Sequence, residues 1–112
     1  MKRPEFKKTK VFNINDLTHY APESVVTKDV MKKNTGNVSV ISVDKGKQII
    51  EELSRFDHLI HITEGKTEII IDNQSYQLTS GQAIIIPANS KSTIIAHEKF
   101  KMISTIIKSG YE

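Results

Sequence analysis

The segment GKQIIEELSRFDHLIHITEG, residues 46–65, carries the side chains of this sequence that are best suited to chemistry. Within it, Glu52, Ser54 and His58 are spaced by even numbers of residues, and His61 follows at an odd spacing. Successive side chains of a β-strand point to opposite faces, so a regular strand would place the first three on one face and His61 on the other. A carboxylate and an imidazole that share a face could bind a metal or move a proton.

A tightly bound metal is not expected at these positions. Imidazole and carboxylate are ligands for zinc, iron and manganese, but even catalytic sites use about three protein ligands. The segment offers two, Glu52 and His58, because a neutral serine hydroxyl is a poor ligand and the chain has no cysteine. We therefore expect no metal cofactor; if a divalent metal binds, Glu52 and His58 are the residues that would hold it.

Two other interpretations of this pair remain open. A carboxylate that is hydrogen-bonded to an imidazole stabilises its protonated form, and the two groups could then act as acid and base in a pocket. His58 could instead be a hydrogen-bonded residue of a pocket wall or of the core, since most buried polar groups have a partner. Glu52 and His58 are the candidates for catalysis, and the sequence identifies no further catalytic residue.

The composition fits one globular domain in the cytoplasm. The chain has 112 residues, of which 38% are hydrophobic and 26% charged, in the range of ordinary folded domains. Without cysteine it can form no disulfide, which is compatible with a reducing compartment. No apolar run is long enough for a signal peptide or a membrane span. We expect a cytoplasmic protein with no membrane partner.

The basic residues are concentrated at the N-terminus. Five of the 16 lysines and arginines lie in the first ten positions, with one of the 13 acidic residues, so the rest of the chain is close to neutral. A basic arm can contact phosphates, but no helix-turn-helix pattern or aromatic-interleaved basic strand accompanies it. We therefore expect a solvated arm and no nucleic-acid partner.

Short segments rich in β-branched residues recur between turn signals, which predicts an all-β protein, a sandwich or a barrel. Residues 1–22 are predicted to form an arm, and residues 23–112 a β-barrel domain. The predicted strands are residues 24–31, 37–44, 48–53, 57–63, 67–72, 76–79, 82–87, 92–96 and 100–108.

Several predicted strands carry isoleucine at consecutive positions, at 69–71, 84–86, 94–95 and 106–107. Both faces of such strands should be covered. The barrel core covers one face, and the N-terminal segment or a second subunit must cover the other. The pattern therefore favours a homodimer, although β-branched residues are also simply good strand formers.

Two spaced motifs give the chain a resemblance to a small single-domain cupin from Asn37 almost to its end. The first cupin motif is G(X)5HXH(X)3–4E(X)6G, and Gly46, Glu52, Ser54, His58 and Gly65 fall on its spacing without a gap. Glu52, Ser54 and His58 thus stand at three of the four positions at which the family has metal ligands. The first motif therefore keeps its spacing, but different residues occupy its ligand positions.

The second cupin motif, G(X)5PXG(X)2H(X)3N, is matched at Gly81 and Pro87. Asn89 replaces the glycine, Ser92 stands at the histidine position and Ala96 replaces the asparagine. The resemblance implies a cupin-type antiparallel β-sandwich, or jelly-roll barrel, with degenerate metal-ligand positions. It also implies a pocket inside the barrel, lined by Glu52, Ser54, His58, Ile60, Ile62, Ser92 and Ile94.

Three functions of different kinds are compatible with such a barrel. We favour a module that binds a small polar or anionic molecule in the pocket without a tightly bound metal. The second is a cupin-type enzyme, an isomerase, an epimerase or a metal-dependent oxygenase, that uses His58 and Glu52. The third is a structural dimer with a vestigial pocket. No feature of the sequence identifies a ligand.

Overall fold

The computed structural model describes residues 7–51 and 54–108. It confirms the predicted all-β class, and each of the nine predicted strands is present with ends that differ by at most two residues. A 3-10 turn, η1 (Ile14–Asp16), precedes them. Within the described parts, no helix has the length and apolar character to span a membrane. The strands are β1 (Val25–Lys33), β2 (Gly36–Val43), β3 (Gln48–Glu51), β4 (His58–Glu64), β5 (Lys66–Ile71), β6 (Gln74–Thr79), β7 (Ala83–Ile86), β8 (Ser92–Ile95) and β9 (Phe100–Ile107).

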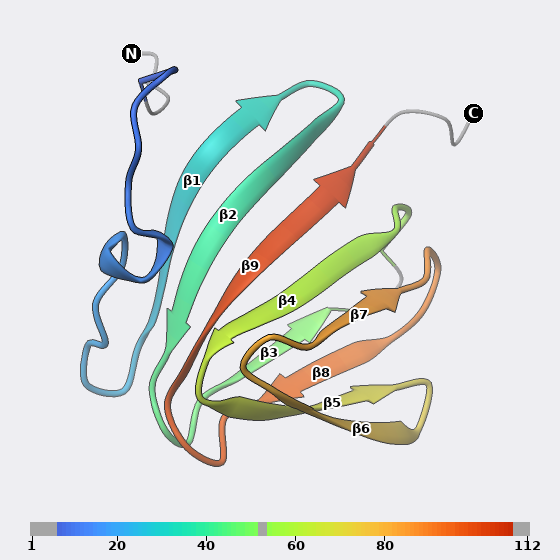
Figure 1. The fold of residues 1–112 in the computed structure, drawn as a ribbon. Helices are drawn as coiled ribbons and strands as arrows, with labels where there is room; N and C mark the ends of the chain where they lie inside the picture. Colours follow the sequence, from blue (N-terminus) through green and yellow to red (C-terminus); the bar gives the residue numbers. More distant parts are fainter. Residues whose placement is uncertain (1–6, 52–53, 109–112) are drawn as a thin grey trace.

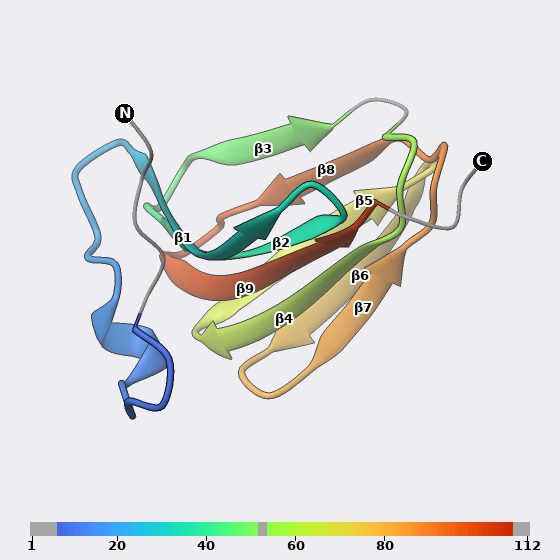
Figure 2. The same cartoon turned by 90° about the horizontal axis from the view of Figure 1, so that it is seen from above.

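Two antiparallel sheets face each other and form a sandwich (Figures 1 and 2). One has five strands in the order β1-β2-β9-β4-β7, and the other has four in the order β3-β8-β5-β6. Only β1–β2 and β5–β6 pair with their neighbours in sequence, because the chain passes repeatedly from one sheet to the other. This topology is the predicted jelly roll.

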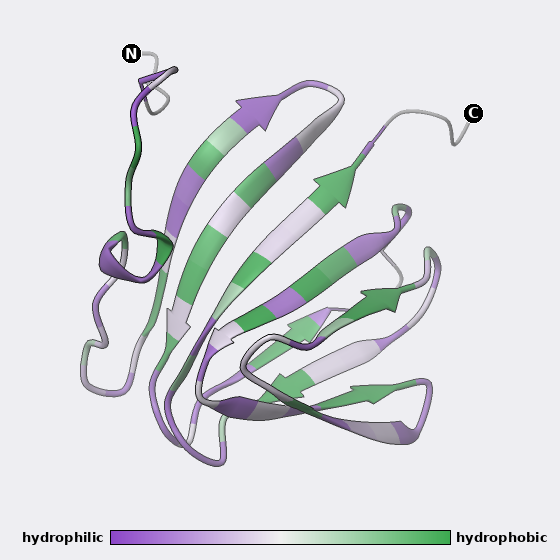
Figure 3. Cartoon of the chain, viewed as in Figure 1, coloured by the Kyte–Doolittle hydropathy of each residue, from purple (hydrophilic) through white to green (hydrophobic). Residues whose placement is uncertain are grey.

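The core lies between the inner faces of the two sheets. Along β4, His58, Ile60 and Ile62 are buried, while Leu59 and His61 are more exposed. The alternation of burial predicted for this strand is thus confirmed. Figure 3 shows that hydrophobic residues occur along the strands of both sheets. The core consists of Val43, Ile60, Ile62, Ile69, Leu78, Ile86, Ile94, Ala96, Phe100 and Met102.

The turn between β4 and β5 depends on Gly65. Its φ of +76° lies in the left-handed region, and a Cβ added there would lie 2.7 Å from the backbone oxygen of Lys99. A glycine is therefore needed here for two reasons: it adopts the positive φ of the turn, and it lets the turn pack closely against the start of β9. Gly81 has a similar φ of +91°, but nothing lies within 4 Å of an added Cβ.

We predict that Gly65→Ala destabilises the protein by roughly 2–4 kcal/mol, because it combines a left-handed alanine with a backbone clash. Gly81→Ala is the matched control and should cost about 1 kcal/mol, for the backbone conformation alone. Urea unfolding of the two variants measures the difference. Equal losses of stability would contradict a packing role for Gly65.

Residues 13–20, which precede β1, pack on the outer face of the five-stranded sheet (Figure 2). Lys101 of β9 is only 7% exposed, and its Nζ donates hydrogen bonds to the backbone oxygens of Asn15 (2.5 Å) and Thr18 (2.9 Å). The side chains of Thr18 and Ser42 form a further buried hydrogen bond. This part of the predicted arm, although polar, is therefore fixed to the sheet by a buried cation.

Tyr20 lies at the end of the segment, residues 13–20, that packs on the sheet. Its hydroxyl donates to Glu64 Oε2 at 2.5 Å, and the ammonium groups of Lys99 and Lys101 lie 4.8 Å and 5.2 Å from its ring centre. Burial, together with the hydrogen bond to Glu64, raises the pKa of Tyr20 above its usual range, so the hydroxyl stays protonated and donates.

We predict that Lys101→Met releases residues 13–20, because two backbone oxygens would lose their charged donor. The loss of stability should be about 1–3 kcal/mol, with faster amide exchange at residues 13–20 and unchanged exchange in β4 and β9. Lys99→Met is the control, since it removes only an exposed cation–π contact of about 0.5–1 kcal/mol. Unchanged exchange at residues 13–20 in Lys101→Met would show that other contacts fix the arm.

Candidate functional site

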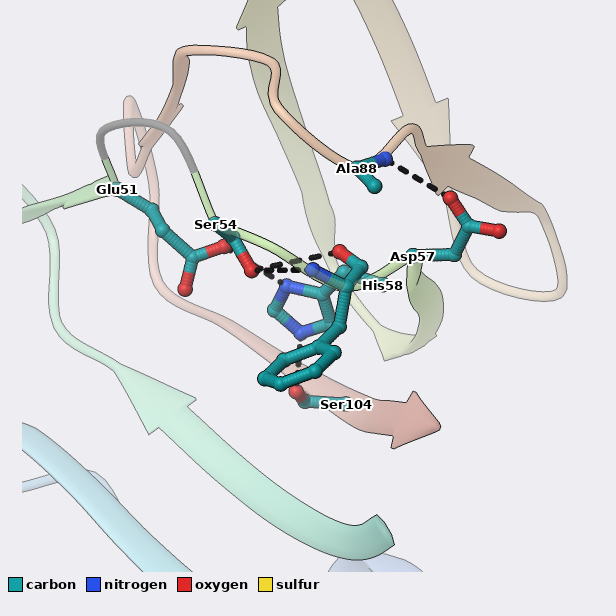
Figure 4. A network of polar contacts seen from close by, with 7 residues as sticks. Glu51, Ser54, Asp57, His58, Ala88 and Ser104 are labelled. Carbon is teal, nitrogen blue, oxygen red and sulfur yellow. Dashed lines mark hydrogen bonds and ion pairs between the residues drawn. The ribbon is translucent and has the colours of Figure 1, made fainter. Parts of the chain in front are cut away.

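A polar cluster interrupts the apolar interior where β4 begins. His58 is 8% exposed, and its ring points between the two sheets (Figure 4). Its Nε2 is hydrogen-bonded to the hydroxyl of Ser104, which is 5% exposed on the inner face of β9. The register of the sheet pairs Ser104 with Ile60 and His58 with Ile106, so the ring reaches diagonally between neighbouring strands.

A carboxylate from the opposite sheet reaches the other ring nitrogen. Glu51, the last residue of β3, places Oε1 3.4 Å from His58 Nδ1, and its side chain is 35% exposed. Figure 4 shows Glu51 and Ser104 on different sides of the imidazole. His58 therefore links the two sheets, and the cluster is accessible to solvent from the Glu51 side.

The contacts within the cluster of Glu51, His58 and Ser104 determine which ring nitrogen of His58 carries the proton. An ionised carboxylate can only accept hydrogen bonds, so Nδ1 of a neutral His58 carries the proton and faces Glu51. Nε2 then accepts from the Ser104 hydroxyl. If His58 gains a second proton, Nε2 becomes a donor and Ser104 must turn its hydroxyl away. The cluster can thus take up a proton by rotating one hydroxyl.

The loop before β4 holds His58 in position. Ser54 Oγ accepts a hydrogen bond from the Phe56 amide (3.4 Å) and is placed 3.3 Å from the Phe56 carbonyl oxygen, to which it donates. Asp57 points away from His58 and accepts the Ala88 amide at 2.8 Å (Figure 4). The Asn89 amide donates to the Ser54 carbonyl oxygen at 2.5 Å. These bonds connect the loop to the β7–β8 connection.

The structure places the predicted site residues in different surroundings. Glu52 lies outside the described residues. Ser54 is half-buried and holds the loop, while Ser92 is buried on β8, paired in register with Glu51. Three predicted pocket residues belong to the close-packed core: Ile60, Ile62 and Ile94.

Glu51 and Ser104 were not among the predicted site residues. Ile49 and Glu51 share a face of β3, and Ile49 packs against the core, so alternation from Ile49 would have turned Glu51 inward. The prediction continued one regular strand into residue 53, and of that segment the structure describes β3 as far as Glu51. Ser104 alternates with the core residues Phe100 and Met102 of β9, a signal that was present in the sequence.

The described side chains do not fit a tightly held metal. Within residues 7–51 and 54–108, no three histidine or acidic side chains come together in a way that could hold one. Both ring nitrogens of His58 already have a partner in the chain, Ser104 on one side and Glu51 on the other. A metal on either nitrogen would have to displace that partner.

The order Ser104, His58 and Glu51 resembles the connectivity of a serine hydrolase triad, but its setting differs. Ser104 lies in the middle of β9, which is paired with β2 on one side and β4 on the other. The amides around it therefore serve the sheet and cannot form an oxyanion hole. The arrangement supports proton transfer by His58 rather than nucleophilic attack by Ser104.

Solved structures identify the fold. The chain is similar to a conserved protein of unknown function from Streptococcus pyogenes, with 25% identity and a TM-score of 0.87 over 96% of this chain and 94% of the other. It is also similar to a cupin 2 conserved barrel domain protein from Leptotrichia buccalis, with 24% identity and a TM-score of 0.88 over 92% of this chain and 50% of the other. A cupin superfamily protein from Desulfitobacterium hafniense matches with 19% identity and a TM-score of 0.85, over 96% and 98% of the two chains.

The chain has a cupin fold. No protein-family model matches its sequence, and no curated protein matches it significantly. The resemblance stated from the two spaced motifs is therefore confirmed by structure. In this chain the motif glycines keep the positive φ values that their turns need, and Pro87 follows the end of β7 as predicted.

We predict that Ser104→Ala changes the imidazole signals of His58, because Nε2 loses its partner. The loss of stability should be about 1–3 kcal/mol, the cost of an unpaired buried group. Ser39→Ala is the matched control: Ser39 is equally buried at 5% and paired with Ser104 across the sheet, but it bonds to Asp29. Nitrogen-15 NMR of the histidines measures both. Identical His58 signals in the wild type and in Ser104→Ala would contradict the contact.

Proposed function

We propose that this cupin binds a small polar molecule at the cluster of Glu51, His58 and Ser104, without a tightly bound metal. The observation that carries the proposal is the cluster itself, in which three polar side chains from both sheets converge beside the apolar core. Burying polar groups costs free energy that an apolar core would avoid. A few converging polar groups against apolar walls are the usual form of a small-molecule site.

The charges of the cluster favour a neutral ligand that carries hydroxyl or amide groups. Glu51 is a carboxylate 3.4 Å from His58, so an anion would meet a negative charge unless the imidazole is protonated. A hydroxyl group can both donate to Glu51 and accept from a ring N–H. The anionic ligand expected as an alternative would therefore bind better as the pH falls, whereas a neutral ligand would not require a protonated ring.

An acid–base enzyme is the second candidate, and the contact between Glu51 and His58 favours it. A carboxylate behind an imidazole orients the ring and stabilises its charge when it takes a proton from a substrate. An isomerase or epimerase needs such a base, and Glu51 is the described carboxylate that could assist it. The metal-dependent oxygenase alternative finds no support in the donors described above. A structural dimer with a vestigial pocket is the third candidate.

We predict that untagged protein purified without chelator contains only background metal, and that His58→Ala contains the same amount. Elemental analysis measures both. The physical reason is that His58 has no free ring nitrogen and too few described neighbours to complete a metal site. Near-stoichiometric metal in the wild type that disappears in His58→Ala would overturn the metal-free proposal.

A panel of polyols, sugars, amides and small carboxylates tests the binding proposal by thermal shift. A ligand of the right class should raise the melting temperature by mass action, with about 2.7 kcal/mol of added stability at a hundredfold excess over Kd. Glu51→Gln and His58→Ala should abolish the rise, and His61→Ala, on the opposite face of β4, should keep it. A rise that survives in all three variants would place the ligand elsewhere. Turnover that depends on His58 would favour the enzyme.

A further inference from the structure

The sandwich is open on one side, where both sheets end in a strand that is paired along one edge only. Among the described residues, β7 pairs only with β4, and β6 pairs only with β5. The two strands lie on the same side of the molecule (Figures 1 and 2). Side chains on the inner faces of β6 and β7 can therefore reach solvent between the two sheets.

A hollow lies between these two edge strands. It has a volume of about 610 Å³, and its apolar walls are formed by Ile71, Ile84, Ile85 and Pro87. This volume is within the usual range of small-molecule sites, roughly 300–1,000 Å³. None of the three residues of the polar cluster at His58 lines the hollow, so the two are separate places in the fold.

Tyr76 provides an aromatic surface in the hollow. It lies two residues from the buried Leu78 on β6, and the register pairs it with Ile69 of the core, so its ring is on the inner face of the four-stranded sheet. Because β6 is an edge strand, Tyr76 is nevertheless 39% exposed. Its hydroxyl donates to Gln74 Oε1 at 2.9 Å, which holds the ring in place.

Asp72 gives the hollow its charge, because it is the only charged residue among those that line it. It lies in the turn between β5 and β6 with a φ of +47°, and its Oδ1 accepts the backbone amide of Lys91 at 3.0 Å. This bond fixes the carboxylate but does not neutralise it, since a backbone amide carries no net charge. The hollow thus combines a fixed carboxylate, an aromatic ring and apolar walls.

These three features select one class of ligand. The carboxylate attracts a positive charge and repels an anion. The face of a tyrosine ring also attracts a cation, and the apolar walls gain from covering a hydrocarbon body. A bare divalent metal ion is not suited to the hollow, because calcium and magnesium require several oxygen ligands and the lining offers one carboxylate.

We propose that this hollow binds an organic ammonium ion, that is, a small aromatic or aliphatic molecule that carries a protonated amine. The amine lies at Asp72 and the ring of Tyr76, and the hydrocarbon body lies against the isoleucines of β5 and β7. The proposal does not depend on the function of the polar cluster, because the two sites share no residue. The hollow is open to solvent, so we expect weak binding of a small probe, with a Kd of about 0.1–10 mM.

Two probes of the same shape but different charge test the proposal. 2-Phenylethylammonium carries the expected charge, and 2-phenylethanol is its neutral counterpart. Titration of the full chain with each probe, followed by proton–nitrogen NMR, locates binding and measures its Kd. The ammonium probe should shift the signals of residues 71–76 and 84–86 with saturation, and it should bind roughly 5- to 30-fold more tightly than the alcohol.

Two variants and a control assign the binding to the lining residues. Asp72→Asn keeps an oxygen for the Lys91 amide and tolerates a positive φ, so it should fold normally and lose the preference for the ammonium probe. Tyr76→Leu should weaken binding of this probe by roughly 3- to 30-fold. Asp44→Asn is the matched control, because Asp44 likewise accepts a backbone amide, that of Glu23 at 2.7 Å, but lies outside the lining of the hollow.

The same titrations can overturn the proposal. Equal binding of the two probes would do so, as would the absence of saturable shifts at residues 71–76 and 84–86. A preference for the ammonium probe that Asp72→Asn retains and Asp44→Asn loses would place the cation elsewhere. Shifts confined to Glu51 and His58 would assign the amine to the polar cluster instead of the hollow. The dispersion of the NMR spectra confirms that each variant is folded.

Discussion

The position of β9 between β2 and β4 is the constraint on which the rest of the structure depends. Without this strand the five-stranded sheet would divide into the β1–β2 hairpin and the β4–β7 pair, because only β9 joins them. Its inward residues Phe100 and Met102 fill the core, and Ser104 contacts His58. Its outward Lys101 fixes the segment before β1. One strand thus carries the core, the polar cluster and the cover of the outer face.

His58 adds a second connection, between the sheets instead of within one. Its ring lies between a serine of the five-stranded sheet and a glutamate of the four-stranded sheet. Any molecule that replaces one of these partners changes a contact that spans the sandwich. A change of protonation at His58 would have the same effect, because Ser104 and Glu51 contact different ring nitrogens. A ligand bound at this cluster would therefore be coupled, through one side chain, to the relative position of the two sheet edges.

Much of the fold could be predicted from the sequence, because strand alternation and turn chemistry are local. All nine strands were found, and the glycines of both motifs lie at positive φ as their turns require. The site was predicted less well. Glu52, which the sequence suggested as the carboxylate partner of His58, lies outside the described residues, and among those described the carboxylate that contacts His58 is Glu51. Ser104 joins the site from 46 residues away, a pairing that depends on topology and not on any local pattern.

The central place of β9 also bears on how the protein folds. Its partners β2 and β4 are made long before it, so during synthesis each of them has an unpaired edge until residues 100–107 have left the ribosome. Sheets that depend on such distant pairings form slowly, and open edges invite association with other chains. The chain is thus most prone to associate with other chains in the time between the synthesis of β4 and the synthesis of β9.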